Sequence, residues 1–598
     1  MARPTHQAIK TLVPEDVYTD RQEFLDYFYA YALKAGTRRA MSTVLLGKRR
    51  MGKTEIFKRV VNRLFFEQDH TDPNAVVPVY YSFRDTPPKR WEFAIEYVEN
   101  ILRWYAAFRL RRPELLAEGG ILRHKLPDFV RSHITITPGI TGILRILDGL
   151  RIQEVTIPEK TALWAPRHFS DRDDSTIVMF LDEFQNTRLP QETFDIVGFM
   201  QEAVESPTCP HFVTGSAMTI LSKEILGRGA LFGRFESDPI DAMTEYWGAE
   251  LARRAAAYYG VTVAELLPPV ISARCGGNPF YITAVVKQAA KQGTAIDNEE
   301  VVNYLLAVDL SSGFIWAELN DQVMRWIERI NQYGITKWIL YLSALEEGER
   351  IEPEHIRQQL LEKDGKAVDI ATIKDVLIRL SRGDLLEYME LGGWFRKVDD
   401  PILLDFLKAW GQFEVEGQRQ AKVVTDTIKQ YEALQRRFND LKGYLAEVYL
   451  AQILWSGQRQ TFSGAYFHRQ EDVTIPGIFY DIHHRLRLDA SAESEVDVYA
   501  STGREIWLCE SKWWETRKVG VAVVHDLLAL AEKLKDFEGR KYFEGERPLP
   551  LRVWLFAHNG VTPEAEALLR QHQIYWSDRA DLDAVIKTLG LRKLPAHD

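Results

Sequence analysis

The stretch "MSTVLLGKRRMGKTEIFKRVVNRLFFE", residues 41–67, constrains the fold of this chain more than any other. Its first six residues are typical of a short buried strand, and residues 55–67 repeat apolar side chains at helical spacing. Between them, GKRRMGKT fits the phosphate-binding pattern GxxxxGK[ST]. The pattern alone arises by chance about once in a hundred chains of this length. The order strand, glycine-rich loop, helix therefore predicts an α/β domain with a phosphate site.

The loop residues have separate expected roles. The two glycines permit a tight turn, backbone N–H groups at the helix start bind phosphates, Lys53 reaches the β and γ phosphates, and Thr54 binds Mg²⁺. The predicted ATP site comprises Gly47, Lys48, Arg49, Arg50, Met51, Gly52, Lys53, Thr54 and Glu55.

Two later strands extend this site. "STIVMFLDEF" ends in Asp182, which is expected to hold Mg²⁺ through water, and Glu183, which is expected to polarise the attacking water. An acidic pair at the end of an apolar strand is common, so the pair alone does not decide the matter. "HFVTGSAMTI" places Ser216 after a third strand, where it could sense the γ phosphate or simply end the strand.

"GRGALFGRFES", residues 227–237, offers two arginines. Arg234 is the candidate arginine finger and Arg228 the second possibility, and at least one of them is expected to be solvated.

The ordered series "VYTDRQEFLDYF", GKRRMGKT, "FLDEFQ", "VTGSAM", "LFGRF" and "CGGNPFYI" resembles the archaeal-type ATPases of the AAA+ and STAND assemblage over residues 15–410. The resemblance implies a P-loop ATPase core over 1–245 and a helical lid over 246–330. It also implies an adenine site near Tyr18, Asp20 and Arg21, and a lid containing Gly277, Asn278 and Pro279. The sequence departs from the family in a long insertion near 85–170 of the ATPase core. Residues 131–158 of the insertion are expected to be a helix followed by β-rich structure.

The middle of the chain predicts three helices and a hairpin turning at Gly392 and Gly393, an order typical of a winged helix over 331–412. Its candidate recognition helix carries Lys374, Arg379 and Arg382, but Asp369 and Asp375 dilute that charge. DNA reading and interdomain packing both stay open. A helical connector is expected over 413–440.

The second candidate site lies near the C-terminus. "LKGYLAEVYLAQILW" predicts a helix around Glu447, and "SEVDVYASTGREIWLCESKWW" predicts two strands joined by a turn. Glu495 and Asp497 share one face of the first strand, and Glu510 and Lys512 share one face of the second strand. Carboxylates of this kind bind Mg²⁺ or Mn²⁺, which activates water, and a lysine can orient that water.

This second pattern resembles the PD-(D/E)XK nucleases over residues 440–560. The resemblance implies a restriction-endonuclease-like α/β domain over 441–598, with Glu447, Asp497 and Glu510 as metal ligands and Lys512 as a catalytic residue. Glu495 is a further ligand or merely exposed. His525 and the pair Trp513 and Trp514 are weaker candidates, for the site and for base stacking, with packing or solvent exposure as the alternatives. Equally, the carboxylates could form a solvated face or an inactive binding module.

Composition limits the function classes. The formal net charge of -10 gives no sign of a generally basic surface, so nucleic acid must be bound through a local cleft or metal ions. The three cysteines show no disulfide or metal spacing, and no stretch approaches the ~20 apolar residues of a membrane helix. A cytoplasmic protein without membrane contact is expected.

The predicted fold is therefore an α/β multidomain chain. The predicted function is ATP-controlled cutting of nucleic acid by a metal-dependent nuclease, with DNA as the favoured substrate and RNA as the alternative. Its expected cofactors are ATP with Mg²⁺, and Mg²⁺ or Mn²⁺ at the nuclease site. DNA, further copies of the chain or a partner protein are the expected partners, and by analogy the setting is prokaryotic defence or genome maintenance. The alternatives are an ATP-driven signalling or scaffolding switch, and a DNA-remodelling ATPase whose nuclease-like domain binds without cutting.

Overall fold

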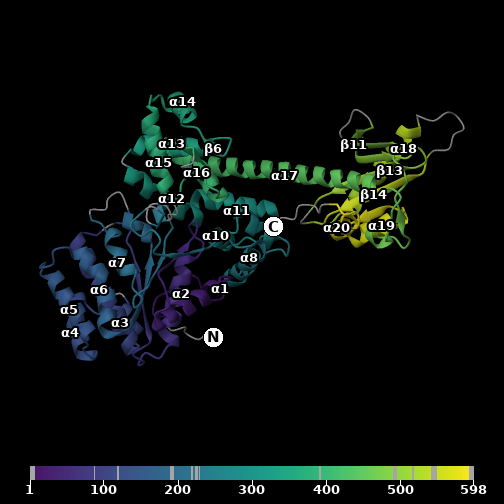
Figure 1. Cartoon of the computed structure of the whole chain (residues 1–598). Coiled ribbons are helices and arrows are strands. Elements are labelled where there is room, and N and C mark those ends of the chain that lie inside the picture. The colour runs from purple at the N-terminus through teal and green to yellow at the C-terminus, as the bar shows by residue number, and fades with distance from the viewer. Residues whose placement is uncertain are drawn as a thin grey trace. The chain divides into compact units, whose positions relative to one another are not determined.

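The computed structural model forms two compact units (Figure 1). Unit 1 comprises residues 1–263, 268–297 and 304–425, and unit 2 comprises residues 264–267, 298–303 and 426–598. The structure describes residues 7–86, 88–117, 120–188, 194–216, 220–221, 226–227, 229–330, 332–389, 392–488, 494–514, 517–539 and 549–591.

Unit 1 contains a five-stranded parallel sheet in the order β2-β3-β4-β1-β5. The strands are β1 (Thr43–Leu46), β2 (Val76–Ser82), β3 (Thr176–Asp182), β4 (His211–Thr214) and β5 (Glu236–Pro239). All seven residues of β3 are buried, as expected for a central strand of a parallel sheet. Because β1, β3 and β4 are neighbours, the loops that follow them meet at the carboxyl edge of the sheet, where α/β folds bind ligands.

Helices cover this sheet. The helix after β1 is α2 (Lys53–Glu67), and it packs on α1 (Gln22–Lys34) and on β2 and β3. The segment between β2 and β3 adds a helical cluster, seen at the outer end of unit 1 in Figure 1. Its helices are α3 (Arg90–Leu110), α4 (Leu126–His133), α5 (Pro138–Arg151) and α6 (Pro158–Asp173).

The expectation of β-rich structure in residues 131–158 is wrong. The β-branched runs there are short and each ends at a proline that opens a helix, Pro138 for α5 and Pro158 for α6. Proline suits the first helical position, and Thr137 caps α5 by accepting the N–H of Ile140. The buried residues of α5 recur at helical spacing and decide the fold of this stretch: Ile140, Ile143, Leu144, Leu147 and Leu150.

Unit 1 continues with helices after β5. These are α8 (Glu245–Tyr259), α9 (Leu267–Arg274), α10 (Pro279–Gln292), α11 (Glu299–Ser312) and α12 (Phe314–Ile330). Residue 267 and residues 299–303, at the starts of α9 and α11, belong to unit 2. The α8 and α10 helices pack against each other.

The three helices and hairpin expected next are confirmed. They are α13 (Tyr333–Leu345), α14 (Pro353–Asp364), α15 (Ile370–Arg382) and a small antiparallel sheet of β6 (Arg350–Ile351), β8 (Trp394–Arg396) and β7 (Glu387–Met389). Gly392 and Gly393 have φ values of 102° and 66°, as their place in the turn requires. On α15, Arg379 pairs with Asp375 at 2.9 Å, so that charge is locally neutralised. The domain boundaries within unit 1 remain predictions.

The expected connector and the expected helix around Glu447 form one continuous helix. After α16 (Pro401–Glu414), the chain enters α17 (Gln420–Ser456), which begins in unit 1 and ends in unit 2. No proline interrupts this stretch, so nothing in the sequence stops the helix at residue 440.

Unit 2 is built on a mixed five-stranded sheet in the order β11-β12-β13-β14-β15. Its strands are β11 (Asp481–Arg487), β12 (Glu495–Ser501), β13 (Ile506–Lys512), β14 (Leu551–Ala557) and β15 (Tyr575–Ser577). The first three run antiparallel and the last three run parallel, so the predicted hairpin and the later core strand are confirmed.

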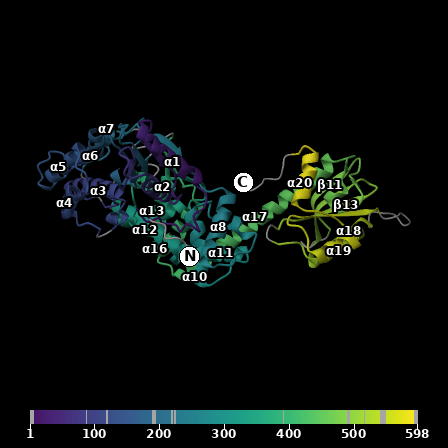
Figure 2. The same cartoon turned by 90° about the horizontal axis from the view of Figure 1, so that it is seen from below.

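Two apolar cores lie on the two faces of this sheet (Figure 2). One face is covered by the end of α17 and by α20 (Arg579–Thr588), and the other by α18 (Val521–Gly539) and α19 (Pro563–Gln571). Within the described residues, no helix has the length and apolarity to cross a membrane. Cys209, Cys275 and Cys509 are buried and free.

Candidate functional site

The loop between β1 and α2 is closed around the amino group of Lys53. This group donates to the backbone oxygen of Gly47 at 2.7 Å and to that of Lys48 at 2.6 Å. Lys53 is buried, and burial lowers its pKa to about 8, although Glu183 opposes that shift. The amine is therefore held inside the loop by carbonyl groups that phosphate oxygens can replace.

The two loop glycines are required for different reasons. Gly52, the N-cap of α2, has φ 92°, a left-handed conformation that L residues rarely adopt. Gly47 is not in that region, but a Cβ on it would lie 2.5 Å from the backbone oxygen of Ile240, which follows β5. The expectation that both glycines serve the turn therefore holds for Gly52, whereas Gly47 permits a close approach to another strand.

The acidic pair at the end of β3 lies beside the loop. Asp182 is 2% exposed, and its carboxylate accepts hydrogen bonds from the hydroxyls of Tyr80, at 2.7 Å, and Thr54. Burial and the neighbouring Glu183 raise the pKa of Asp182. The structure thus brings together Thr54 and Asp182, the two residues expected to hold Mg²⁺.

Glu183 is linked to Ser216 through Gln185. The Gln185 amide donates to the Glu183 carboxylate and to the hydroxyl of Ser216, and its oxygen accepts the N–H of Ser216 at 3.0 Å. The hydroxyl of Ser216 also donates to Glu183 at 3.3 Å. Glu183 has φ 52°, a conformation that L residues rarely adopt outside constrained sites.

Sequence reasoning missed Tyr80 and Gln185. The signal for Gln185 was a polar residue two positions after the acidic pair, in "DEFQ". Tyr80 gave no signal, because only the pairing of β2 with β3 places it near Asp182.

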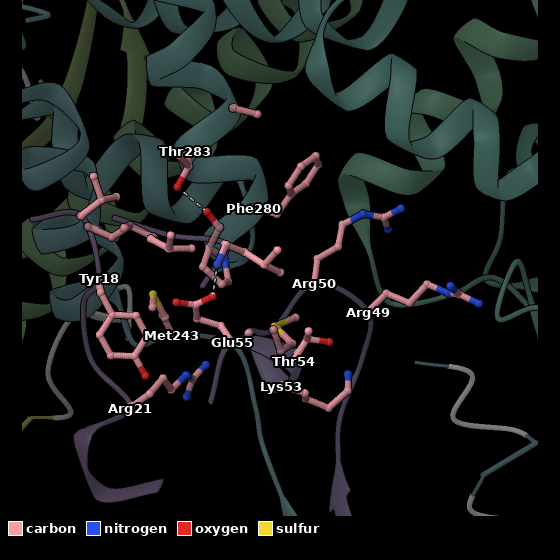
Figure 3. Close-up of a pocket in the computed structure, with 18 of the residues that line it drawn as sticks. Tyr18, Arg21, Arg49, Arg50, Lys53, Thr54, Glu55, Met243, Phe280 and Thr283 are labelled. Atoms are coloured by element: carbon pink, nitrogen blue, oxygen red, sulfur yellow. Dashed lines mark hydrogen bonds between the residues drawn. The ribbon is translucent and has the colours of Figure 1, made fainter. Parts of the chain in front are cut away.

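Lys53, Thr54 and the acidic pair line a cavity of about 460 Å³, a size typical of small-ligand pockets. Figure 3 shows Tyr18 and Arg21 on one side of Glu55, and Lys53 and Thr54 on the other. The lining residues include Tyr18, Arg21, Arg49, Arg50, Met51, Gly52, Lys53, Thr54, Glu55, Asp182, Glu183, Ser216, Met243, Pro279, Phe280 and Thr283. Tyr18 Oη and Arg21 Nε are buried and have no hydrogen-bond partner in the described part of the chain. Asp20 is not among the lining residues.

The residues expected to belong to a lid contact the loop directly. Asn278 caps α10 by accepting the N–H of Phe280 at 3.0 Å, and its amide donates to the backbone oxygen of Arg49 at 3.4 Å. Gly277 has φ 64°, and a Cβ there would lie 2.3 Å from the backbone oxygen of Met243.

Arg49 and Arg50 of the loop line the cavity, whereas Lys48 does not. Lys48 donates to both the backbone and the carboxylate of Asp399, and Arg50 donates to Gln322 at 2.8 Å and Glu318 at 3.3 Å. Figure 3 shows Arg49 and Arg50 extending away from Thr54 and Glu55. The loop is therefore tied to α12 and to the segment before α16.

The candidate arginine finger lies elsewhere. Arg234 pairs with Glu205 at 2.9 Å, donates to backbone oxygens nearby and does not line the cavity. Arg228 lies outside the described residues. A finger role for Arg234 stays a prediction, because this site does not include it.

The predicted acidic site lies where β12 and β13 separate. Their backbone pairing stops at Val498 and Cys509, and beyond it the Asp497 carboxylate accepts the N–H of Ser511 at 2.7 Å. Lys512 donates to Oε1 of Glu510 at 2.8 Å. Burial and the neighbouring Glu510 raise the pKa of Asp497 to about 7, and burial also raises the pKa of Glu510. Asp497, Glu510 and Lys512 are therefore brought together.

Glu447 completes the acidic site but is already paired. It is 4% exposed, and Nε and a terminal nitrogen of Arg485 donate to its two oxygens, each at 2.9 Å. Its charge nevertheless acts on both Asp497 and Glu510. Glu495 points to the same arginine at 4.0 Å and to Arg487 at 3.1 Å.

The donor set fits a cation at Glu510. Oε2 of Glu510 is buried and has no hydrogen-bond partner within the described ranges, and a divalent ion would satisfy it. As arranged, no three His, Cys, Asp or Glu side chains of the described residues form a metal-holding group. The ligand set of Glu447, Asp497 and Glu510 therefore stays a prediction, and it requires Arg485 to move.

The weaker candidates near this site have different surroundings in the structure. Trp513 is buried, packs against Phe556 and His558, and so cannot stack on a base. Trp514 stacks under the guanidinium of Arg517 at 3.7 Å. His525 is exposed on α18.

Comparisons with known proteins give structural likenesses only. No protein-family model matches the chain, and no curated protein matches it. The Walker-type ATPase of Pyrococcus abyssi is similar over 67% of this chain and 99% of its own, with 16% identity and a TM-score of 0.43. The ORC2 protein of Aeropyrum pernix is similar over 71% of this chain and 98% of its own, with 14% identity and a TM-score of 0.39. The RuvB branch migration motor of Thermotoga maritima is similar over 68% of this chain and 98% of its own, with 13% identity and a TM-score of 0.30.

Proposed function

We propose that the chain binds and hydrolyses ATP and that this cycle controls a metal-dependent nuclease in unit 2 that cuts DNA. The observation that carries the ATPase part is the meeting of Lys53, Thr54, Asp182 and Glu183 beside one cavity at the carboxyl edge of a parallel sheet. Phosphoryl transfer needs positioning and charge neutralisation, and this set supplies both.

The residues divide the work of hydrolysis. Backbone N–H groups at the start of α2 and the amine of Lys53 bind the phosphates. Thr54 and Asp182 would hold Mg²⁺, which neutralises charge on the phosphates. Glu183 orients the attacking water, and Gln185 and Ser216 hold its carboxylate beside the end of β4. Tyr18, Arg21 and Met243 line the far part of the cavity, where the base and ribose would lie.

The nuclease part rests on the unpaired oxygen of Glu510 next to Asp497 and Lys512. Asp497 and Glu510 would hold Mg²⁺ or Mn²⁺, which activates water and stabilises the charged transition state of phosphodiester cleavage. Lys512 sits at the carboxylate pair, where its amine can orient that water or stabilise the leaving oxygen. A divalent ion also supplies positive charge that an acidic chain otherwise lacks for binding DNA.

One observation favours a second function, in which unit 2 binds DNA or a protein without cutting. Arg485 holds both oxygens of Glu447, so the expected helical ligand is not free in this arrangement. In that case the ATPase acts as a signalling, scaffolding or DNA-remodelling switch.

Cleavage assays separate these functions. Circular single-stranded and double-stranded DNA are incubated with Mg²⁺ or Mn²⁺, with and without ATP, using the wild-type chain and the variants Lys53→Ala and Lys512→Ala. Lys58→Ala on α2 and Lys535→Ala on α18 are matched controls, because neither lysine lines a candidate site.

The nuclease proposal expects cutting by the wild type and both controls and none by Lys512→Ala, while Lys53→Ala reports whether nucleotide permits or restrains cutting. ATP hydrolysis without DNA cleavage under every condition would instead favour the binding function. Unchanged hydrolysis in Lys53→Ala would refute the ATPase site itself.

A further inference from the structure

Arg485 has an unusual backbone conformation at the edge of the unit 2 sheet. It lies in β11, the edge strand, with φ 53°, and the pairing of β11 with β12 skips it between His484 and Leu486. A non-glycine residue rarely adopts this conformation, and such residues cluster at functional sites. The register of the two strands is the same on both sides of Arg485, so this residue stands opposite Asp497, and its guanidinium reaches the acidic site.

The contact that Arg485 makes there has the geometry of anion recognition. Its guanidinium presents two N–H groups to the two oxygens of Glu447, which is the fork that also matches a phosphate group. The Arg485 side chain is 47% exposed, whereas that of Glu447 is 5% exposed. The pair therefore joins a buried carboxylate to a guanidinium that solvent and large anions can reach.

A divalent ion and Arg485 cannot both use the oxygens of Glu447. Both carry positive charge, and a cation at Glu447 would repel the guanidinium as well as take its acceptors. The nearest remaining acidic partner is Glu495, which already accepts from Arg487 at 3.1 Å. Displaced from Glu447, the guanidinium loses the two acceptors it holds in this structure, and the oxygens of a nucleic-acid phosphate can replace them.

The surroundings favour a phosphate as that acceptor. The strand "DIHHRLR" is largely exposed and carries His483, His484 and Arg487 beside Arg485. Arg485 also lies 5.4 Å from the centre of the exposed Tyr444 ring. An exposed basic strand with an adjacent aromatic ring is a common way to hold a nucleic-acid strand.

We propose that Arg485 is a positioning residue that occupies Glu447 until a divalent ion displaces it, and that the freed guanidinium then holds a DNA phosphate next to Asp497 and Glu510. This inference rests on the proposed nuclease site. It assigns Arg485 two opposite effects, since it competes with the metal ion and assists DNA binding.

The test measures these two effects separately. The full-length chain carries Lys512→Met throughout so that DNA stays intact, and no nucleotide is present. Free Mn²⁺ is followed by electron paramagnetic resonance, and binding of a labelled duplex is followed by fluorescence anisotropy at saturating Mn²⁺. The variants are Arg485→Gln and Arg485→Gly, of which the glycine variant suits the positive φ and protects against misfolding. Arg487→Gln is the matched control, because Arg487 pairs with Glu495 and not with Glu447.

In both Arg485 variants Mn²⁺ should bind about tenfold more tightly while duplex DNA binds about tenfold more weakly. Arg487→Gln should keep the Mn²⁺ affinity. A purely structural role for Arg485 would not move the two affinities in opposite directions. Equal Mn²⁺ affinity with and without Arg485 would overturn the inference.

A Glu510→Ala variant distinguishes failure of this inference from failure of the proposed function. If Mn²⁺ binding does not depend on Glu510, the metal site itself is wrong and the inference falls with it. If Mn²⁺ binding depends on Glu510 but not on Arg485, the metal site stands and only the role of Arg485 is refuted.

Discussion

The hydroxyl of Tyr80 donates a 2.7 Å hydrogen bond to Oδ2 of Asp182, from one strand of the parallel sheet to the end of the next. Removing the hydroxyl by Tyr80→Phe leaves one oxygen of a buried carboxylate without this donor. Because such outer contacts orient metal ligands, we expect the Mg²⁺ concentration needed for half-maximal ATP hydrolysis to rise about tenfold. The measurement is an Mg²⁺ titration of hydrolysis at saturating ATP.

The neighbouring Tyr81 gives the matched control for that experiment. It is also buried on β2, but within the described residues its hydroxyl makes no hydrogen bond to the Asp182 carboxylate. Tyr81→Phe should keep the Mg²⁺ dependence of the wild type. The same Mg²⁺ requirement in all three chains would mean that Asp182 does not depend on Tyr80.

Glu183→Gln should separate nucleotide binding from hydrolysis. The amide keeps the shape of the side chain but cannot polarise water, so hydrolysis should fall by about a hundredfold or more. Affinity for ATP should stay unchanged, since Lys53 and the loop provide the phosphate contacts. Calorimetry with ATP and a phosphate-release assay measure the two effects, and Glu202→Gln, an exposed residue of α7 (Gln201–Val204), is the control. Retained turnover in Glu183→Gln would assign the water-activating role elsewhere.

Local sequence patterns were sufficient for the parts of the fold that depend on neighbours in the chain. The strand before GKRRMGKT, the buried strand ending in Asp182 and the hairpin carrying Asp497 and Glu510 all have apolar periodicity that packing reinforces. The short β-branched runs that end in proline led to a wrong prediction of β structure in residues 131–158. In the structure, Thr137 caps the helix α5 and is not part of a strand.

Local sequence patterns could not predict contacts between distant segments of the chain. The ion pair of Glu447 with Arg485 joins residues 38 positions apart, one on α17 and one on β11, and no local propensity encodes it. The hydrogen bonds from Gln185 to Ser216 likewise require β3 and β4 to be neighbours. Residue type gave the chemistry of each site, whereas the partner of each residue followed only from the sheet order.

Gly47→Ala should disturb the phosphate loop by crowding and not by backbone strain. The new Cβ would lie 2.5 Å from the backbone oxygen of Ile240, and relieving that contact should cost about 1–3 kcal/mol and weaken ATP binding. Gly334→Ala is the control, because no atom lies within 4 Å of a Cβ there and the change should stabilise α13 by about 0.5–1 kcal/mol. Thermal unfolding and ATP titration measure both variants. Wild-type behaviour of Gly47→Ala would show that β5 and the loop can separate without cost.

Asp309 should make the stability of unit 1 fall as pH rises. Its carboxylate accepts backbone N–H groups of Phe314 and Ile315 at the start of α12, but Oδ2 is buried without a hydrogen-bond partner among the described residues. Burial raises the pKa of Asp309 from 3.8 to about 7. Between these values the folded protein keeps a proton that the unfolded chain has released, so the stabilisation present below the lower value is lost as pH approaches the upper one.

The isosteric variant Asp309→Asn cannot titrate and therefore isolates this effect. Relative to the variant, the wild type should lose at most about 4 kcal/mol of unfolding free energy between the two pKa values. Urea unfolding of both full-length chains on the acid side of that window, and again above it, measures the difference. We expect the unfolding free energy of the wild type to fall relative to that of Asp309→Asn as pH rises. If the two chains instead change in parallel, the Asp309 carboxyl has the same pKa in the folded and unfolded states, and the burial of Oδ2 is relieved by water.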